Sequence, residues 1–461
     1  MLMHPPIANG TDPRPSFWLR VREFAVPPSM IETATDRGLA GDWSGACAAA
    51  GFDTDVDLRA LTSEHGRDVA AQVLDDLHHL APDLLRWHLP RVAPDGLLRP
   101  GLTVTLARYG PAEFRRPCGG AGSVHLVART APTWADAGQR VVLALWDGSG
   151  SASHSHPHPH PRPNRRHRLD LHRHLWDARR STELRTRCGT GQSPPPPVID
   201  HALADAAPEG VALDRWAAEI DILLRADGQR DGPVRVRCGG RRDLVVERVA
   251  SSVGPASVRL VDDHPRGRIT ALPVLPDAAT WVLPDLELIR SGAITADRLH
   301  PLVAAALESD RSVPAPPPTT VSDNRIHLVD CRGHRHRIGP VDGALTALDH
   351  NPTEIRREEL LFALGGTPIP CVQAIDEAHR SPDCLPGVRE RLNHGDAAGA
   401  LAVVEGLLGP DAVLRDGPLL DELRASVDRR STYDRFLSTP AETPPPSRPR
   451  RSARSRRARS H

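Results

Sequence analysis

The stretch Arg140-Val-Val-Leu-Ala-Leu-Trp146 gives the clearest indication of the fold. A short, continuous apolar run that contains β-branched residues is typical of a buried β-strand. Two similar runs precede it, Leu102-Thr-Val-Thr-Leu106 and Val124-His-Leu-Val127, and clusters of glycine and proline separate the three. We therefore predict a small sheet within residues 97–147.

Helical patterns lie on both sides of these strands. In residues 31–90, apolar residues recur at spacings of three and four, as an amphipathic helix requires; they are Val69, Val73, Leu77 and Leu80. Similar patterns predict helices at 169–187, 213–225, 354–364, 372–379, 397–408 and 418–436. Further strands are predicted at 234–238, 244–249, 258–261, 326–330 and 334–338. Because helices and strands form separate groups, we predict the α+β class, with small antiparallel sheets.

Proline- and histidine-rich stretches divide the predicted elements into units. Segments of this composition bury little apolar surface, and we expect them to be disordered or to act as linkers. The expected order is a disordered extension (1–29), a helical layer with a small sheet (30–147), a His/Pro-rich linker (148–166), an α+β unit (167–310), a Pro-rich linker (311–320), a hairpin with a helical unit (321–437) and a disordered Arg-rich tail (438–461).

All 58 basic side chains of this 461-residue chain are arginine. The absence of lysine excludes a P-loop nucleotide site, a protein kinase and a pyridoxal-phosphate enzyme, because each needs a lysine amine. We interpret the bias as GC-rich coding, which favours a bacterial source, and not as functional selection. The formal net charge is zero, so no overall field attracts nucleic acid or an anionic membrane.

Seven cysteines are scattered along the chain without a Cys-x-x-Cys pair. Their odd number and their spacing favour reduced thiols in a cytosol over a disulfide framework. No stretch approaches the roughly 20 apolar residues that span a bilayer. Residues 1–28 also lack the apolar core of a signal peptide. We therefore expect a cytoplasmic protein with no membrane partner.

A predicted hairpin offers one candidate metal site. If Arg332-Gly333 forms a two-residue turn, Cys331 lies beside His334, and His336 follows on the same face of the hairpin. Thiolate and imidazole are ligands that zinc prefers. The sequence shows no fourth ligand, and an ordinary polar hairpin is the alternative interpretation.

Two further features could bear chemistry. The tract that contains His154, His156, His158 and His160 could bind Zn²⁺, Ni²⁺ or Cu²⁺ loosely, and a linker without function is the alternative. Cys371 follows a proline at the start of a predicted helix, where the helix dipole lowers a thiol pKa. A buried, inert thiol is the alternative there. No organic cofactor is indicated.

Two segments of the chain match each other and suggest a shared local structure. Gly41-Asp42-Trp43-Ser44-Gly45-Ala46 resembles Gly395-Asp396-Ala397-Ala398-Gly399-Ala400, and each precedes an Ala-rich helical pattern. In both copies the aspartate is expected to cap the helix through its carboxylate. A sequence rich in alanine and glycine also produces such matches by chance, so duplication is one of two interpretations.

The end of the chain is strongly basic. Phosphate neutralisation by such a tail would be independent of sequence and sensitive to salt. No aromatic residue is present there to stack on bases. The residues that would contact nucleic acid are Arg448, Arg450, Arg451, Arg454, Arg456, Arg457 and Arg459.

These observations favour a non-enzymatic cytoplasmic protein that binds unidentified protein partners, as a scaffold or adaptor. No catalytic motif that we considered is present, and the composition excludes several enzyme classes. One alternative is a protein that binds nucleic acid nonspecifically through its arginine tail. A second is a thiol- or metal-dependent enzyme built on Cys331, His334, His336 or Cys371.

Overall fold

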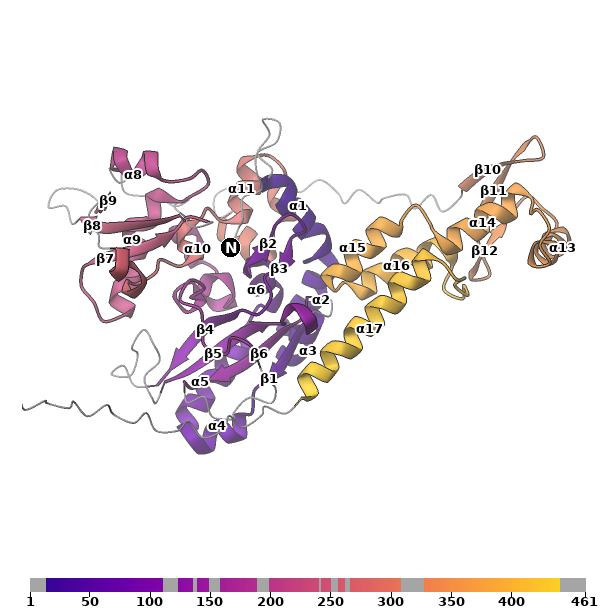
Figure 1. Cartoon of the computed structure of the whole chain (residues 1–461). Helices are drawn as coiled ribbons and strands as arrows, with labels where there is room; N and C mark the ends of the chain where they lie inside the picture. Colours follow the sequence, from indigo (N-terminus) through magenta and orange to yellow (C-terminus); the bar gives the residue numbers. More distant parts are fainter. Residues whose placement is uncertain are drawn as a thin grey trace, which may run out of the picture.

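The computed structural model of the chain consists of a body and a long arm (Figure 1). It describes residues 14–110, 123–135, 139–148, 158–188, 199–239, 242–249, 256–261, 266–307 and 327–439. The body contains a four-stranded sheet, a three-stranded sheet and the helices around them, and the arm contains another three-stranded sheet followed by helices. Helices and antiparallel pairs are segregated, which confirms the predicted α+β class.

The four-stranded sheet organises the body. Its strands have the order β1-β6-β5-β4; β1 is parallel to β6, and the other neighbouring pairs are antiparallel. Nearly every residue of β4, β5 and β6 is buried, because other elements cover both faces. The predicted strands are confirmed, as β4 (Thr103–Tyr109), β5 (Val124–Thr130) and β6 (Val141–Trp146), with β1 (Phe52–Asp55) added at the edge.

Helices from the first hundred residues cover one face of this sheet. Their apolar side chains join those of β5 and β6 in one core, in which Leu77 and Leu84 contribute from the helices and Leu126 and Leu143 from the strands. The helices are α1 (Arg14–Phe24), α2 (Pro28–Leu39), α3 (Trp43–Ala49), α4 (Leu58–His65), α5 (Arg67–His78) and α6 (Pro82–His88), followed by the short strands β2 (Arg91–Val92) and β3 (Leu97–Leu98).

Helix α1 corrects the prediction of a disordered extension over 1–29. Residues 14–29 contain α1 and the start of α2, and residues 1–13 lie outside the described ranges. Trp18 of α1 is buried, packs on Trp87 with 5.5 Å between ring centroids, and donates a hydrogen bond of 3.2 Å to Glu287. These partners are distant in sequence, so the local proline-rich composition gave no sign of them.

The predicted linker at 148–166 is also wrong in part. Its residues from 158 onward pack on the edge of the first sheet, where Thr103 donates a hydrogen bond of 2.6 Å to the His160 carbonyl. The next residues form 3₁₀ turns and only a short helix, not the long helix predicted over 169–187. These elements are η3 (Leu169–Leu171), η4 (Arg173–Leu175), η5 (Ala178–Arg180) and α7 (Glu183–Arg187).

A second sheet and its helices form the other half of the body. Strands β7 (Pro233–Arg237), β8 (Asp243–Val249) and β9 (Ser257–Leu260) pair in chain order. The predicted apolar face of α9 packs on them through Trp216, Ile220 and Leu223. Helix α9 spans Leu213–Ala226 and is accompanied by α8 (His201–Ala206) and α10 (Asp277–Thr280). Helices α11 (Pro284–Arg290) and α12 (Pro301–Leu307) join the first core instead.

The arm, residues 327–439, begins with an antiparallel sheet of order β10-β11-β12. The hairpin predicted at 326–338 is confirmed, whereas β12 and α15 were not predicted. The elements are β10 (His327–Cys331), β11 (His334–Val341), β12 (Ala344–Ala347), α13 (Pro352–Ala363), α14 (Pro370–Arg380), α15 (Leu385–His394), α16 (Ala397–Leu408) and α17 (Pro418–Ser438). Its apolar core is separate from those of the body.

Contacts at the end of α15 and at the end of α17 attach the arm to the body. The buried guanidinium of Arg86 donates hydrogen bonds of 2.8–2.9 Å to the carbonyls of Ala25, Gln139 and His394, and His394 ends α15. The far end of α17 places Tyr433 and Phe436 on the second face of the four-stranded sheet. In the described part of the chain, no helix combines the length and the apolarity needed to cross a membrane.

Candidate metal centre

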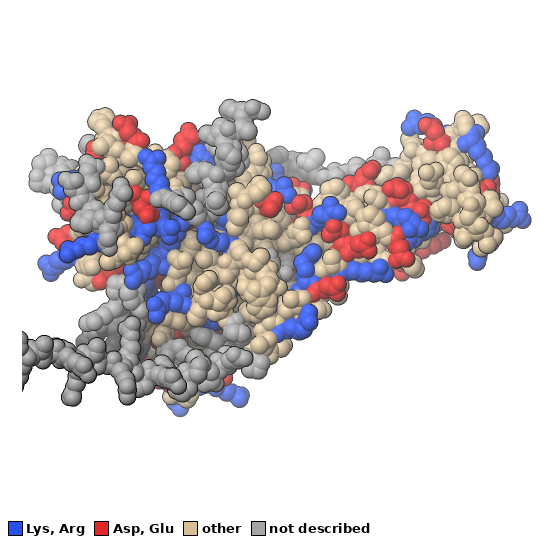
Figure 2. All heavy atoms as spheres, in the orientation of Figure 1, with Lys and Arg blue, Asp and Glu red and all other residues tan. Residues whose placement is uncertain are grey.

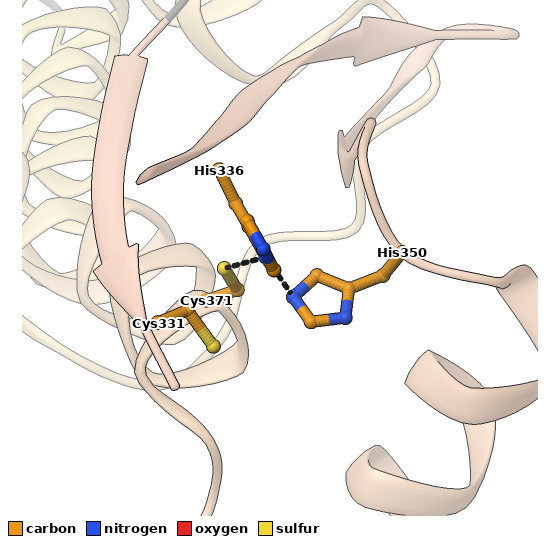
Figure 3. Close-up of side chains that lie close together, drawn as sticks. All are labelled: Cys331, His336, His350 and Cys371. Carbon is orange, nitrogen blue, oxygen red and sulfur yellow. Dashed lines mark hydrogen bonds between the residues drawn. The ribbon is translucent and has the colours of Figure 1, made fainter. Parts of the chain in front are cut away.

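Four side chains of the arm that can bind a metal converge at one point (Figure 3). Cys331, His336, His350 and Cys371 each offer one ligand atom, and these four atoms all lie within 4.8 Å of one another. Both cysteines are fully buried in the apolar core of the arm, and both histidines are partly buried. Among the described residues, this is the group of His, Cys, Asp and Glu whose geometry fits a metal ion.

The β10–β11 hairpin supplies two of the four ligands. Arg332 and Gly333 have φ values of 52° and 84°, as a tight two-residue turn requires. The turn pairs Cys331 with His334 and Val329 with His336. Because paired residues share a face, Cys331 and His336 point to the same side of the hairpin, as predicted.

His334 is not a member of the cluster. It lies on the same face, and its ring stacks on that of His336 with 6.4 Å between centroids, but it is exposed at the outer end of the hairpin. The predicted placement of His334 beside Cys331 is confirmed, but the four ligand atoms that converge do not include one from His334.

Two other elements complete the set. His350 lies in the turn between β12 and α13, and Cys371 is the second residue of α14. Helix α14 begins at Pro370, which is a favoured first helical residue, and its first turn faces the hairpin. Cys371 was predicted as a reactive or inert thiol but not as a fourth ligand beside the hairpin, and His350 was not predicted. The spacing Cys-x4-His-x13-His-x20-Cys matches no familiar zinc motif, so only the fold could reveal it.

The contacts inside the cluster are short. His336 Nδ1 and His350 Nε2 are 2.6 Å apart, and Cys371 Sγ is 3.9 Å from His336 Nδ1. Around a tetrahedral zinc ion, two nitrogen ligands at about 2.05 Å lie about 3.3 Å from each other. Binding therefore requires the two imidazole rings to separate by roughly 0.7 Å, a shift within the reach of side-chain rotation.

A carboxylate supports one of the histidines from outside. His350 Nδ1 lies 3.7 Å from Glu354 Oε2, and Glu354 forms an ion pair of 2.6 Å with Arg332 in the hairpin turn. Histidines that bind metals commonly direct their second nitrogen at such a carboxylate, which fixes the ring orientation. Glu354 thus leaves Nε2 of His350 as the nitrogen that faces the cluster.

The two thiols lie in surroundings that disfavour a bare thiolate. Burial raises the pKa of Cys371 to about 12, and the adjacent Cys331 contributes in the same direction. Of the two interpretations of Cys371, the buried thiol therefore fits the structure, and a thiol pKa lowered by the helix dipole does not. A divalent cation at the cluster would reverse this preference and bind both sulfurs as thiolates.

The donor set indicates which metal fits. Two sulfurs and two imidazole nitrogens, partly enclosed in an apolar core, are the ligands of structural zinc sites. Such sites hold zinc with four protein ligands, whereas catalytic zinc keeps a position open for water or substrate. The four side chains can fill all four positions, so the geometry corresponds to a structural site.

The other residues predicted to bind metal or nucleic acid lie away from this cluster or outside the described residues. His158 Nδ1 accepts a hydrogen bond from the His160 backbone, and its Nε2 faces the Thr130 carbonyl at 3.1 Å, so its ring serves the packing of this segment. His154 and His156 lie outside the described residues. The same is true of the tail arginines 448–459, whose contact with nucleic acid stays a prediction.

Comparisons with known proteins assign this chain to no family. No protein-family model, no curated protein and no solved structure matches this chain.

Proposed function

We propose that this chain is a partner-binding protein whose arm is held in shape by a structural zinc ion. The convergence of Cys331, His336, His350 and Cys371 supports this proposal. These four ligands connect a hairpin, a turn and a helix that are otherwise joined by a small apolar core. Zinc that is bound by four protein ligands stabilises a fold and leaves no position for substrate.

Zinc would matter most for the β10–β11 hairpin. Most residues of β10 are exposed or half-buried, and Cys331 is its single buried residue. A hairpin with so little buried surface is marginal by itself. A metal bound at Cys331 and His336 would attach both strands to α14, and the free energy of binding would become free energy of folding.

The surface beside the four-residue cluster indicates what kind of partner the arm could bind. Strand β10 lies at the edge of its sheet, and no strand of the described residues pairs with its outer side. Leu328 in this strand is 54% exposed. An adjoining groove of about 840 Å³ is lined by Leu328 and Val329, and by Ala378, Val403 and Leu407 from α14 and α16. An unpaired edge beside an apolar groove suits an extended peptide that adds a strand.

We therefore propose that the partner contributes an extended segment with alternating apolar residues. Such a segment would pair with the outer edge of β10 and place every second side chain in the groove. Cys331 and His334 close a two-residue turn and form a hydrogen-bonded pair. By alternation, the N–H groups of Leu328 and Asp330 face outward and are available to the peptide.

The zinc half of the proposal is tested by metal analysis. Full-length protein purified under reducing conditions without an affinity tag should contain one zinc ion per chain. Cys371→Ser should lose it, whereas the control Cys384→Ser should retain it, because Cys384 lies in the same arm but outside the cluster. Protein without zinc, or a Cys331–Cys371 disulfide in its place, would refute this half.

The partner half is tested by selecting peptides from a random library on the full-length, zinc-loaded protein. Enriched peptides should show alternating apolar residues and should bind Leu328→Ala with modest loss. Leu328→Pro removes an outward N–H group at an edge position that tolerates proline, so it should abolish binding and leave the zinc content unchanged. Equal binding by Leu328→Pro, or no enriched sequence, would refute strand addition.

A further inference from the structure

A cavity of about 200 Å³ lies in the body, far in sequence from the arm. It opens where the segment 162–165 passes between the first sheet and helix α9. Thr105 of β4 and His125 of β5 lie on one side, and Leu223 of α9 and Val274 lie on the other. Figure 2 shows arginine side chains gathered in this part of the body, where the second sheet meets the first.

The cavity lining is rich in positive charge. Four arginines line it, Arg108, Arg162, Arg165 and Arg168, together with one acid, Asp227. Asp170 and Asp227 form ion pairs with the buried Arg168 at 3.0 and 2.7 Å, and Asp170 also pairs with Arg108 at 3.0 Å. Arg162 has no ion-pair partner among the described residues. The cationic groups thus outnumber the acids at this opening.

The walls between these charges are apolar. Trp146, Leu223 and Val274 are buried and face the cavity, with prolines 163 and 273 at its sides. The volume is of the order that admits one aromatic ring, since an apolar cavity of about 150 Å³ accepts benzene. Shape and lining therefore favour a flat apolar group inside and a negative group at the mouth.

His125 provides a polar contact on the floor. It is buried, its ring meets the edge of Trp146 with 5.0 Å between centroids, and Ser123 Oγ lies 3.4 Å from its Nε2. Its Nδ1 is buried and has no hydrogen-bond partner in the described part of the chain. Buried polar atoms are rarely left unsatisfied. A ligand in the cavity would supply the missing partner.

We propose that this cavity binds a small aromatic oxyanion, with the ring between Trp146 and Leu223 and the phosphate or carboxylate at Arg162 and Arg165. Arginine suits this role because its planar guanidinium binds the oxygens of such groups in pairs. The ion pairs of Asp170 with Arg168 and Arg108, and of Asp227 with Arg168, hold these two inner arginines in position before the ligand arrives. This site is independent of the metal centre.

The test uses 1-naphthyl phosphate as the probe and isothermal titration of the full chain. Wild-type protein should bind one equivalent saturably. The double variant Arg162→Gln/Arg165→Gln should bind at least tenfold more weakly, and Ala271→Phe should lose binding because Ala271 lines the cavity. The matched control Arg59→Gln/Arg67→Gln removes two exposed arginines from α4 and α5 and should bind like wild type.

Three results would overturn the proposal: no saturable binding to wild type, equal weakening in the control variant, or equal affinity for uncharged 1-naphthol. Exposed arginines can be replaced without unfolding the chain, and a thermal melt of each variant verifies this. Cys371→Ser should retain probe binding, because the cavity uses residues of the body alone. The zinc site and the anion site can therefore fail separately.

Discussion

Tyr433, near the end of α17, donates a hydrogen bond of 2.7 Å to Asp53 of β1, which lies 380 residues earlier in the chain. Asp53 also forms an ion pair with Arg140 at 2.5 Å. Burial alone would raise the pKa of Asp53, but these hydrogen bonds lower it below its usual value. The last helix of the arm is thus fixed to the edge strand of the body by a buried hydroxyl and a carboxylate.

Tyr433→Phe removes this hydrogen bond and keeps the aromatic packing. We expect the free energy of unfolding to fall by about 1.5–3 kcal/mol, as for a lost hydrogen bond to a charged group. Urea denaturation measures the change. Ser431→Ala, at an exposed position on the same helix, is the control and should stay within about 0.5 kcal/mol of wild type. Equal stability of Tyr433→Phe and wild type would show that α17 is not held by this contact.

The two sequence matches with Gly-Asp-x-x-Gly form the same local structure. Asp42 and Asp396 each accept a hydrogen bond of 2.8 Å from the backbone N–H three residues later, at Gly45 and Gly399. Each aspartate also pairs with an arginine five residues earlier, at 3.0 and 2.8 Å. The predicted helix caps are confirmed, and glycine is needed because a Cβ at Gly399 would lie 2.1 Å from Asp396 Oδ2.

Gly399→Ala should therefore destabilise the arm although alanine favours helices. The carboxylate of Asp396 would have to turn, which breaks its cap or its ion pair. Gly406→Ala in the same helix is the matched control, because nothing lies within 4 Å of a Cβ there. We expect Gly399→Ala to be less stable than Gly406→Ala by about 1–2 kcal/mol, measured by urea denaturation. Equal stabilities would refute the capping role.

Because several histidines are buried in the folded protein, we expect acid to unfold it. Burial lowers the pKa of His88 to about 4 and that of His394 to about 3, with nearby arginines acting in the same direction. An unfolded histidine titrates near 6.5, so between about pH 6.5 and 4 the unfolded state binds more protons. The free energy of unfolding should fall as pH falls through this window, by about 1.4 kcal/mol per pH unit for each histidine.

The substitution His394→Leu isolates one of these protons. Between pH 4 and 6, the unfolding free energy of this variant should change less steeply with pH than that of wild type. The difference in slope should be about 1.4 kcal/mol per pH unit, which corresponds to one proton. The control His201→Leu changes an exposed histidine at the start of α8 and should keep the wild-type slope. Denaturant titrations at several pH values measure both. An unchanged slope in His394→Leu would mean that His394 is already protonated in the folded state.

A substitution of Glu354, which lies outside the metal cluster, tests whether His350 is a ligand. Glu354→Gln keeps the size of the side chain and removes the charge beside His350 Nδ1. Replacement of such a supporting carboxylate typically weakens metal affinity 10- to 100-fold. Competition with a chromogenic chelator measures zinc affinity. Glu358→Gln is the control, since Glu358 also pairs with Arg332, whereas the ion pair of His350 is with Glu354. Equal affinities in both variants would argue against His350 as a ligand.

Sequence patterns predicted the parts of the fold that short-range periodicity encodes. The run at 140–146 became β6, and the spacing of Trp216 and Ile220 identified α9, because each element buries its own apolar residues. Helix α1 escaped detection since Trp18 finds its partners at Trp87 and Glu287. Residues 169–187 were predicted as a helix, but the ion pairs of Arg173 with Asp76 and Asp177 hold 3₁₀ turns there.

The candidate metal centre could likewise be predicted only in part. Cys331 and His336 could be placed on one face from the hairpin alone, because the turn fixes the pairing. His350 and Cys371 could not be joined to them, since their approach depends on how α14 packs on the sheet. The cavity between Arg162 and α9 was invisible in the sequence for the same reason: its walls come from elements of both halves of the body.

We propose above that a zinc ion in the arm is bound by two sulfurs and two nitrogens. X-ray absorption at the zinc edge of tag-free, full-length protein measures the type and the distance of these ligands directly. We predict two sulfur ligands at about 2.3 Å and two nitrogen ligands at about 2.0 Å. A first shell of oxygen and nitrogen alone, or one with more than four ligands, would contradict the assignment of Cys331, His336, His350 and Cys371.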